Sequence, residues 1–163
     1  MKSNITAVVL VGSIATLGPV AAAGQAAWEE STIPGGMQFR LRNAEGAAIV
    51  LQCVDQGIGV GFAFAEPIRE TARVLLRAVP GERLYAGVTP TDERAIRVEG
   101  YRGLDFVLST LRTKARILAR ASNQQASFDV FGSESVVHQC LRQPDVFGQP
   151  GPAISEDPGR TRG

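Results

Sequence analysis

The chain is poor in the residues on which most enzyme active sites depend. It has 163 residues with one histidine, two cysteines and one tryptophan, and its 17 basic side chains nearly balance its 16 acidic ones. Two cysteines and one histidine are too few ligands for a zinc site at these spacings. Balanced charge provides no overall field that would attract nucleic acid or an acidic lipid surface. We therefore expect no metal, no cofactor and no nucleic-acid partner.

Long hydrophobic runs are also missing, and the one apolar stretch stands at the start of the chain. It covers residues 5–17, which is short of the roughly 20 residues that a spanning helix needs. The basic Lys2 precedes it, and Ala21–Ala23 follow it with the small side chains that a signal peptidase reads. The pattern predicts a cleaved secretory signal over residues 1–23, no membrane span after cleavage, and a periplasmic or secreted protein. An uncleaved N-terminal anchor is the alternative.

Lysine is nearly absent beyond the predicted signal, where Lys114 is the only one and all other basic residues are arginine. Codon bias is the simplest explanation for the preference for arginine. The functional alternative is a surface of planar guanidinium donors suited to carboxylate partners. Arg112, Lys114, Arg116 and Arg120 form a local basic cluster. Part of this cluster complements a helix dipole and part could contact an anion, but it is too small to indicate nucleic-acid binding.

The two cysteines, Cys53 and Cys140, predict one disulfide in an oxidising compartment. The bond would close a loop of about 87 residues, for which the chain-entropy model gives about 4.5 kcal/mol of stabilisation. A catalytic thiol is the competing interpretation, and it would need His138 as its base because the chain has no other histidine.

Alternation of apolar and polar residues predicts a sheet built of short strands. One segment, 67–79, is ambiguous, because its apolar residues fit helical spacing while its second half resembles a strand that ends at Pro80-Gly81. Its place between strands favours a strand over 72–79. The predicted strands are 37–42, 48–54, 58–64, 72–79, 84–88, 95–99, 117–121 and 127–131.

Two helices complete the predicted fold. Residues 103–115 carry an apolar stripe typical of an amphipathic helix. A short final helix, with Ser133 as its N-cap, carries Cys140. We therefore expect an α+β domain with a mainly antiparallel, sandwich-like sheet, one amphipathic helix, a short C-terminal helix and one disulfide. Around the domain at 37–143 we expect an N-terminal lead at 24–36 and a disordered tail at 144–163.

Glycines alternate with bulky residues at Gly57, Gly59 and Gly61, so they share one face of the predicted strand. The spacing does not make a phosphate-binding loop, because no helix start follows the glycines. Glycine weakens a strand, so a reason such as close packing is expected. The smooth face most simply receives Trp28 or another aromatic side chain from within the protein. A partner protein docking on it is the alternative.

Other residue patterns give no catalytic set. The chain has no Gly-x-Ser-x-Gly sequence, and Gly132–Ser135 resembles a helix cap. A hydrolytic triad would need a nucleophile and an orienting acid around His138, which instead fits a lone surface histidine. The acidic pairs Glu29-Glu30 and Asp92-Glu93 are expected in solvated lead and turn segments. We therefore expect the protein not to be an enzyme.

The order of several segments resembles small exported bacterial proteins related to the type VI secretion-associated VMAP-like family. The resemblance rests on Ile49–Cys53, the helix 104–115, Arg116–Arg120, Ser127–Ser133 and Cys140. It implies a periplasmic, β-rich fold with two cysteines and no defined activity.

The chain departs from that family at Val130-Phe131, where the family has leucine and a small residue. The Leu-Gln-Cys strand is also similar to small periplasmic lysozyme inhibitors, although this chain lacks a Ser-Gly-x-x-Tyr inhibitory loop. The leading hypothesis is an exported, non-enzymatic binding or assembly protein that has a protein partner in the cell envelope and serves as an accessory to a secretion apparatus. A secreted inhibitor of an envelope hydrolase such as lysozyme is the second.

Overall fold

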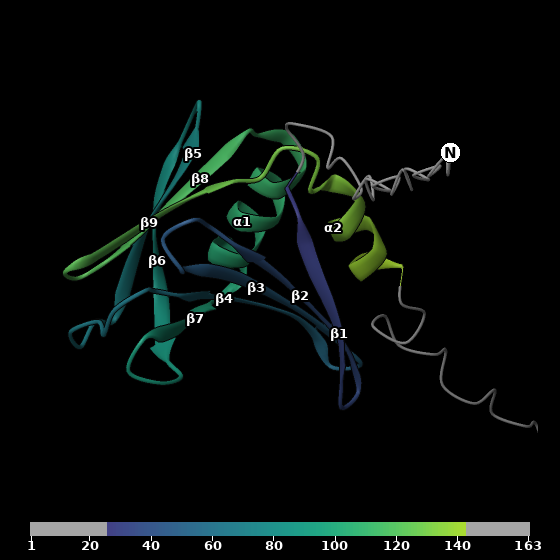
Figure 1. Ribbon diagram of the computed structural model, residues 1–163, viewed down its shortest axis with the longest axis horizontal. Coiled ribbons are helices and arrows are strands. Elements are labelled where there is room, and N and C mark those ends of the chain that lie inside the picture. The colour runs from purple at the N-terminus through teal and green to yellow at the C-terminus, as the bar shows by residue number, and fades with distance from the viewer. Residues whose placement is uncertain (1–25, 143–163) are drawn as a thin grey trace, which may run out of the picture.

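The computed structural model of the protein describes residues 26–142, and within them an antiparallel sheet wraps around two helices (Figure 1). The helices are α1 (Tyr101–Thr113) and α2 (Glu134–Leu141), and neither is both long and apolar enough to cross a membrane. The predicted signal at 1–23 and the predicted disordered tail at 144–163 lie outside the described residues. The strands are β1 (Trp28–Ile33), β2 (Gly36–Arg42), β3 (Ala48–Val54), β4 (Gly57–Ala63), β5 (Arg73–Val79), β6 (Arg83–Pro90), β7 (Ala95–Glu99), β8 (Arg116–Ala121) and β9 (Gln124–Asp129).

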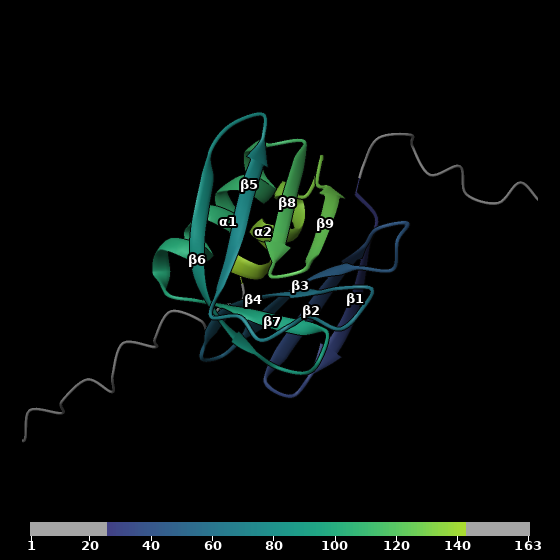
Figure 2. The same ribbon diagram turned by 90° about the vertical axis from the view of Figure 1, so that its left-hand side faces the viewer.

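The nine described strands form one continuous sheet in the order β1-β2-β3-β4-β7-β6-β5-β8-β9. The sheet folds over so that β5, β6, β8 and β9 stand at a steep angle to β1–β4, with both helices on the enclosed side (Figure 2). At one end the first and last strands approach each other, because the Ala26 N–H donates to the Phe131 carbonyl at 2.9 Å. The Asn43 side-chain amide also donates to the Ser127 carbonyl at 3.1 Å. This confirms the expected α+β fold, with a single bent sheet providing both layers.

The core lies on the enclosed, inner face of the sheet. Phe62 on β4 and Phe128 on β9 meet there with ring centroids 6.1 Å apart, which links the two halves of the sheet. Val107 and Leu111 of α1 are fully buried against this face. Gly103 brings the helix close to the sheet, because a Cβ atom at this position would lie 2.6 Å from Val98 Cγ1.

Most of the predicted strands are confirmed within one to three residues at their ends. The ambiguous segment 67–79 forms strand β5 from Arg73 onward, with Val74, Leu76 and Ala78 buried on alternate positions. The amphipathic helix begins at Tyr101 rather than 103, directly after Gly100, whose φ of 78° favours glycine.

The expected N-terminal lead at 24–36, placed outside the domain at 37–143, contains strand β1, so the sheet begins earlier than expected. This strand pairs along its whole length with β2, from Trp28 opposite Leu41 to Ile33 opposite Gly36. Four of its residues are exposed and polar, so it is an edge strand without an apolar alternation. The sequence of this segment therefore lacks the alternation that predicts a strand. The segment is extended because it pairs with β2.

Ser133 takes the N-cap position of α2 but does not cap the helix with its side chain. Its hydroxyl instead accepts a hydrogen bond of 2.8 Å from the Trp28 indole Nε1. Ser133 is fully buried, so this bond satisfies two polar groups that would otherwise lack partners in the interior. The residue joins the first strand to the last helix rather than closing a helix end.

Candidate functional site

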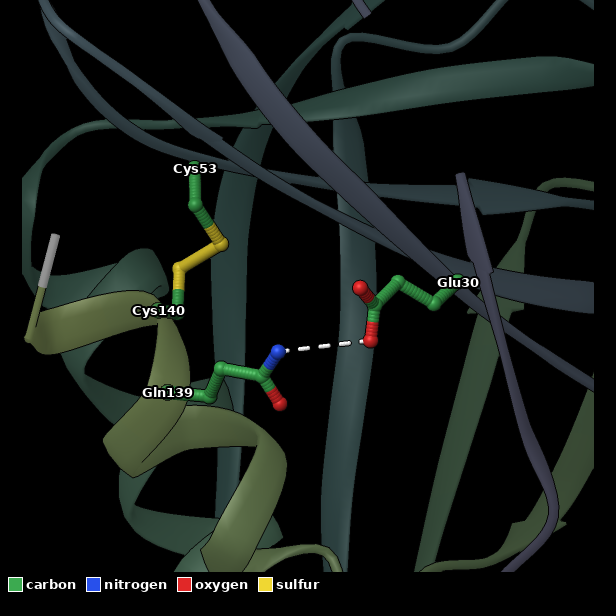
Figure 3. The surroundings of a disulfide bond; sticks show 4 residues. All are labelled: Glu30, Cys53, Gln139 and Cys140. Atoms are coloured by element: carbon green, nitrogen blue, oxygen red, sulfur yellow. Dashed lines mark hydrogen bonds between the residues drawn. A yellow bond between two sulfur atoms is a disulfide. The ribbon is translucent and has the colours of Figure 1, made fainter. Parts of the chain in front are cut away.

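The two cysteines form the predicted disulfide. Cys53 on β3 and Cys140 on α2 are bonded with their Cα atoms 5.3 Å apart, and both are fully buried (Figure 3). The neighbouring Gln139 donates a hydrogen bond of 3.3 Å to the Glu30 carboxylate on β1. Helix α2 is thereby attached to two different strands. Because Cys140 is bonded and buried, it offers no thiolate, and the hypothesis of a catalytic thiol is wrong.

His138 lies on α2 with its side chain partly exposed. Its Nε2 atom is 3.6 Å from the carboxylate of Glu134, one helical turn earlier. Cys140 cannot serve as its nucleophile, and among residues 26–142 no group of three or more His, Cys, Asp or Glu side chains is placed to hold a metal ion. In this arrangement the imidazole and the carboxylate form an ordinary surface pair.

A hollow of about 610 Å³ runs between α1 and the turn between β5 and β6. Its hydroxyl groups are already bonded within the helix. Thr110 donates to the Phe106 carbonyl at 2.7 Å, and Thr113 donates to the Ser109 carbonyl at 2.8 Å. These two threonine hydroxyls are therefore engaged within the helix.

The glycines of β4 lie on the outer face of the sheet. We call Gly57, Gly59 and Gly61 the glycine floor; their partners on β3 are Val54, Gln52 and Val50, respectively. A Cβ atom at Gly59 would make only ordinary contacts, at 3.7 Å from Gln52 Oε1. At Gly61 it would lie 3.0 Å from the Ile96 carbonyl oxygen, so there a larger residue would crowd β7.

The expectation that Trp28 packs on these glycines is wrong. Trp28 pairs with Leu41, which belongs to the buried inner face, whereas the glycine floor faces outward. The aromatic pair Phe62 and Phe128 also lies on the inner face. No aromatic side chain of the described residues therefore covers the outer face at Gly57 and Gly59.

A shallow hollow of about 280 Å³ borders the glycine floor at Gly61 and Gln52. Gln52 donates a hydrogen bond of 3.1 Å to Gln38 on β2, so two amide side chains lie side by side at the edge of the hollow. Arg40 and Arg97 also line it. Arg97 contacts the Glu99 carboxylate at 3.2 Å, which leaves Arg40 as the remaining guanidinium.

Arg40 carries the least expected feature of this hollow. Its Nε atom is buried and has no hydrogen-bond partner among the described residues. The carboxylate of Glu29, its cross-strand neighbour, contacts Arg42 instead, at 3.4 Å. Arg40 therefore places a buried, unpartnered donor beside the hollow, which an external acceptor could reach only if neighbouring side chains moved aside.

Sequence reasoning found the glycine floor but missed its surroundings. Arg40 and Gln38 stand two positions apart on β2, which puts them on one face of a strand. The sequence shows this spacing. It does not show that β2 is separated from the glycine strand β4 by β3 alone, so that both sets of residues lie on one outer face. The pairing of β2 with β3 and of β3 with β4 brings the two sets together.

The predicted basic cluster is divided by the fold. Arg112 is exposed on α1, and Lys114 follows the helix with its Nζ near Gly81. Arg116 binds the Asp129 carboxylate at 3.0 Å. Arg120 lies on the outer face of β8 opposite Leu75, so it belongs to a different surface.

The acidic pairs are both exposed, but only one lies in a turn. Asp92-Glu93 stand between β6 and β7, and the Asp92 carboxylate accepts a hydrogen bond of 2.7 Å from the Arg94 N–H. Glu29-Glu30 lie in β1 instead of a solvated lead, and both make contacts with other elements. Glu30 therefore has a structural role that its sequence position did not suggest.

Fold and site together define a disulfide-linked α+β protein with an open, glycine-lined face on a bent antiparallel sheet. Comparison with protein-family models, with curated proteins and with solved structures finds no match for this chain.

Proposed function

We propose that the protein is an exported, non-enzymatic binding protein of the bacterial envelope that holds a protein partner against the glycine floor. The observation that carries the proposal is the open outer face of β4 beside a buried donor. An interior strand with three glycines in alternate positions loses strand stability, and no side chain of the described residues fills the space above Gly57 or Gly59 beyond the contacts with Gln52.

The chemistry of the hollow indicates what the partner presents. The unpartnered Arg40 Nε is a donor, and an unsatisfied buried N–H costs about 1–3 kcal/mol. A partner carbonyl or carboxylate could accept from it once the side chains around it move aside, and the Gln38 and Gln52 amides offer both donors and acceptors. A backbone segment that lies flat on the glycines could bring such groups into reach.

Export is supported by the disulfide, because such bonds persist in oxidising compartments and are rare in the cytosol. The predicted signal at residues 1–23 points in the same direction. An accessory role in a secretion apparatus is part of this proposal, and it follows from the resemblance to the VMAP-like family.

The substitution Gly59→Val tests the site, because the structure gives room for the new side chain. A β-branched residue in place of an interior glycine should leave the melting temperature unchanged or raise it. Purified oxidised protein immobilised as bait should capture a partner from an envelope extract, and the Gly59→Val protein should lose that partner.

Gly87→Val on β6 is the matched control, because Gly87 also lies on the outer face and a Cβ there would meet only Glu99 Cβ at 3.9 Å. This variant should keep the partner. Equal capture by the wild type and by Gly59→Val would refute the glycine floor as the binding site.

A second candidate function is inhibition of an envelope hydrolase such as lysozyme. It is favoured by the exposed turn at residues 91–94, which is held by the Asp92 bond to Arg94 and by the Thr91 N–H donating to Ala95 O at 2.9 Å. An inhibitor needs such a rigid polar loop to enter an enzyme cleft. A lysozyme-inhibition assay separates the two functions, and Asp92→Ala should abolish inhibition if the turn inserts.

A further inference from the structure

A second surface, on the outer face of β5, β6 and β8, carries charge of one sign only. We call the outward-facing side chains around Arg73, Arg77, Arg83 and Arg120 the arginine face. The outer surface of these three strands is turned toward the viewer in Figure 2. Every charged side chain on the outward positions of these three strands is an arginine. The neighbouring Arg116 is already bound to Asp129.

The strand register places these arginines against one another. Arg77 on β5 lies directly opposite Arg83 on β6, and Arg120 on β8 lies opposite Leu75. Like charges in directly opposite positions destabilise a sheet. Within residues 26–142, none of the four arginines in the arginine face forms an ion pair. Fold stability therefore gives no reason for the arrangement.

The centre of the arginine face is apolar and concave. Leu75 lies half-buried between Tyr85 and Arg120, and Tyr85 is 64% exposed. These side chains, with Arg73 and Ser122, line a hollow of about 300 Å³. A guest in the hollow would contact an aliphatic side chain, an aromatic ring and two guanidinium groups.

We propose that the arginine face docks an acidic segment of a protein partner, with a carboxylate held between Arg73 and Arg120. Guanidinium groups bind carboxylates through two parallel hydrogen bonds, which a lysine cannot do. Arginine and tyrosine are enriched in protein interfaces, while lysine is depleted, and the face has this composition. The exposed ring of Tyr85 and the half-buried Leu75 supply the apolar contacts that a purely ionic surface would lack.

The proposal is independent of the glycine floor, because the two surfaces use different strands. The arginine face is formed by β5, β6 and β8, whereas the glycine floor belongs to β4 and its neighbours β3 and β7. Gly59→Val should therefore leave binding to the arginine face unchanged, and failure of one proposal does not decide the other.

The test uses a fluorescein-labelled poly-glutamate peptide and measures its fluorescence anisotropy with the oxidised protein at low salt. The double variant Arg73→Gln/Arg120→Gln should bind the peptide about tenfold more weakly or worse, because two charge-assisted contacts are lost. Arg112→Gln/Arg142→Gln removes the same charge from exposed positions elsewhere and should bind as the wild type does. Equal weakening in both variants would overturn the site.

A single variant separates binding from folding. Arg77→Glu replaces a like-charge pair by an opposite-charge pair with Arg83, so it should raise the melting temperature while weakening peptide binding. A variant that is more stable but binds the peptide as tightly as the wild type would contradict the proposal.

A membrane is the competing occupant, and vesicles containing phosphatidylglycerol serve as its probe. We expect the vesicles to bind no better to the wild type than to Arg73→Gln/Arg120→Gln. Vesicle binding that depends on these arginines, together with failure to bind the peptide, would replace the acidic segment by a lipid surface.

Discussion

At the scale of single residues, Gly103 decides how closely α1 packs on the sheet. A Cβ atom there would lie 2.6 Å from Val98 Cγ1 and 2.9 Å from Ala86 Cβ. We expect Gly103→Ala to lower the free energy of unfolding by about 1–3 kcal/mol, because the helix must move away from β6 and β7. Chemical denaturation followed by circular dichroism measures this loss.

Gly87→Ala is the control for that change, since it adds the same methyl group at an exposed strand position with an ordinary contact. It should not lower the stability, because alanine is preferred to glycine inside a strand. Equal stability of Gly103→Ala and the wild type would show that the helix does not approach the sheet as closely as described.

The hydrogen bond between Trp28 and Ser133 gives a second prediction at this scale. Ser133→Ala leaves the indole Nε1 without its 2.8 Å acceptor and should cost about 1–3 kcal/mol. Trp28 is the only tryptophan in the chain, so its fluorescence reports on this site directly. The exposed Ser135→Ala should stay within about 0.5 kcal/mol of the wild type. An unchanged emission spectrum and stability in Ser133→Ala would rule out the bond.

At the scale of elements, the disulfide determines whether α2 stays in place. A helix of eight residues is marginal by itself, so its attachment to β3 through Cys53 and Cys140 is essential to it. We expect Cys53→Ala/Cys140→Ala to lower the free energy of unfolding by about 2–5 kcal/mol. Hydrogen exchange should show the amides of α2 losing protection before those of the central strands.

The same experiment contains its own control, because the wild-type protein can be measured oxidised and after reduction. Reduced wild type should resemble the double variant in both stability and exchange. Retained protection of α2 in the reduced protein would mean that packing alone holds the helix.

The elements that sequence could predict are those with a buried face. Strand β5 was predicted from its place between strands and from the Pro80-Gly81 turn, although apolar residues of the segment also fit helical spacing. In the structure Val74, Leu76 and Ala78 are buried on alternate positions. Strand β1 was missed because an exposed edge strand needs no such period. Ser133 was predicted as a cap from its type, but burial next to Trp28 gave its hydroxyl a different partner.

At the scale of the whole molecule, the glycine floor and the arginine face both depend on strand pairings that no local sequence pattern predicts. β4 pairs with β7 and β5 with β8, so segments distant in sequence become neighbours. The glycine floor was recognisable within one strand. The sheet order was needed to place Arg40 near this strand and to place Arg73 and Arg120 on the lining of one hollow. Sequence therefore predicted the cysteine pair and the glycines, but not their surroundings.

The central claim is that a protein partner lies on the glycine floor, and site-specific photocrosslinking in the cell tests it most directly. A photoreactive residue in place of Val54, which lies opposite Gly57, should form a covalent adduct with one envelope protein. The same residue in place of Gln125 on β9 should not. We expect Gly59→Val to abolish the Val54 adduct while the protein stays folded. No adduct at Val54, or an adduct that Gly59→Val leaves unchanged, would contradict the account.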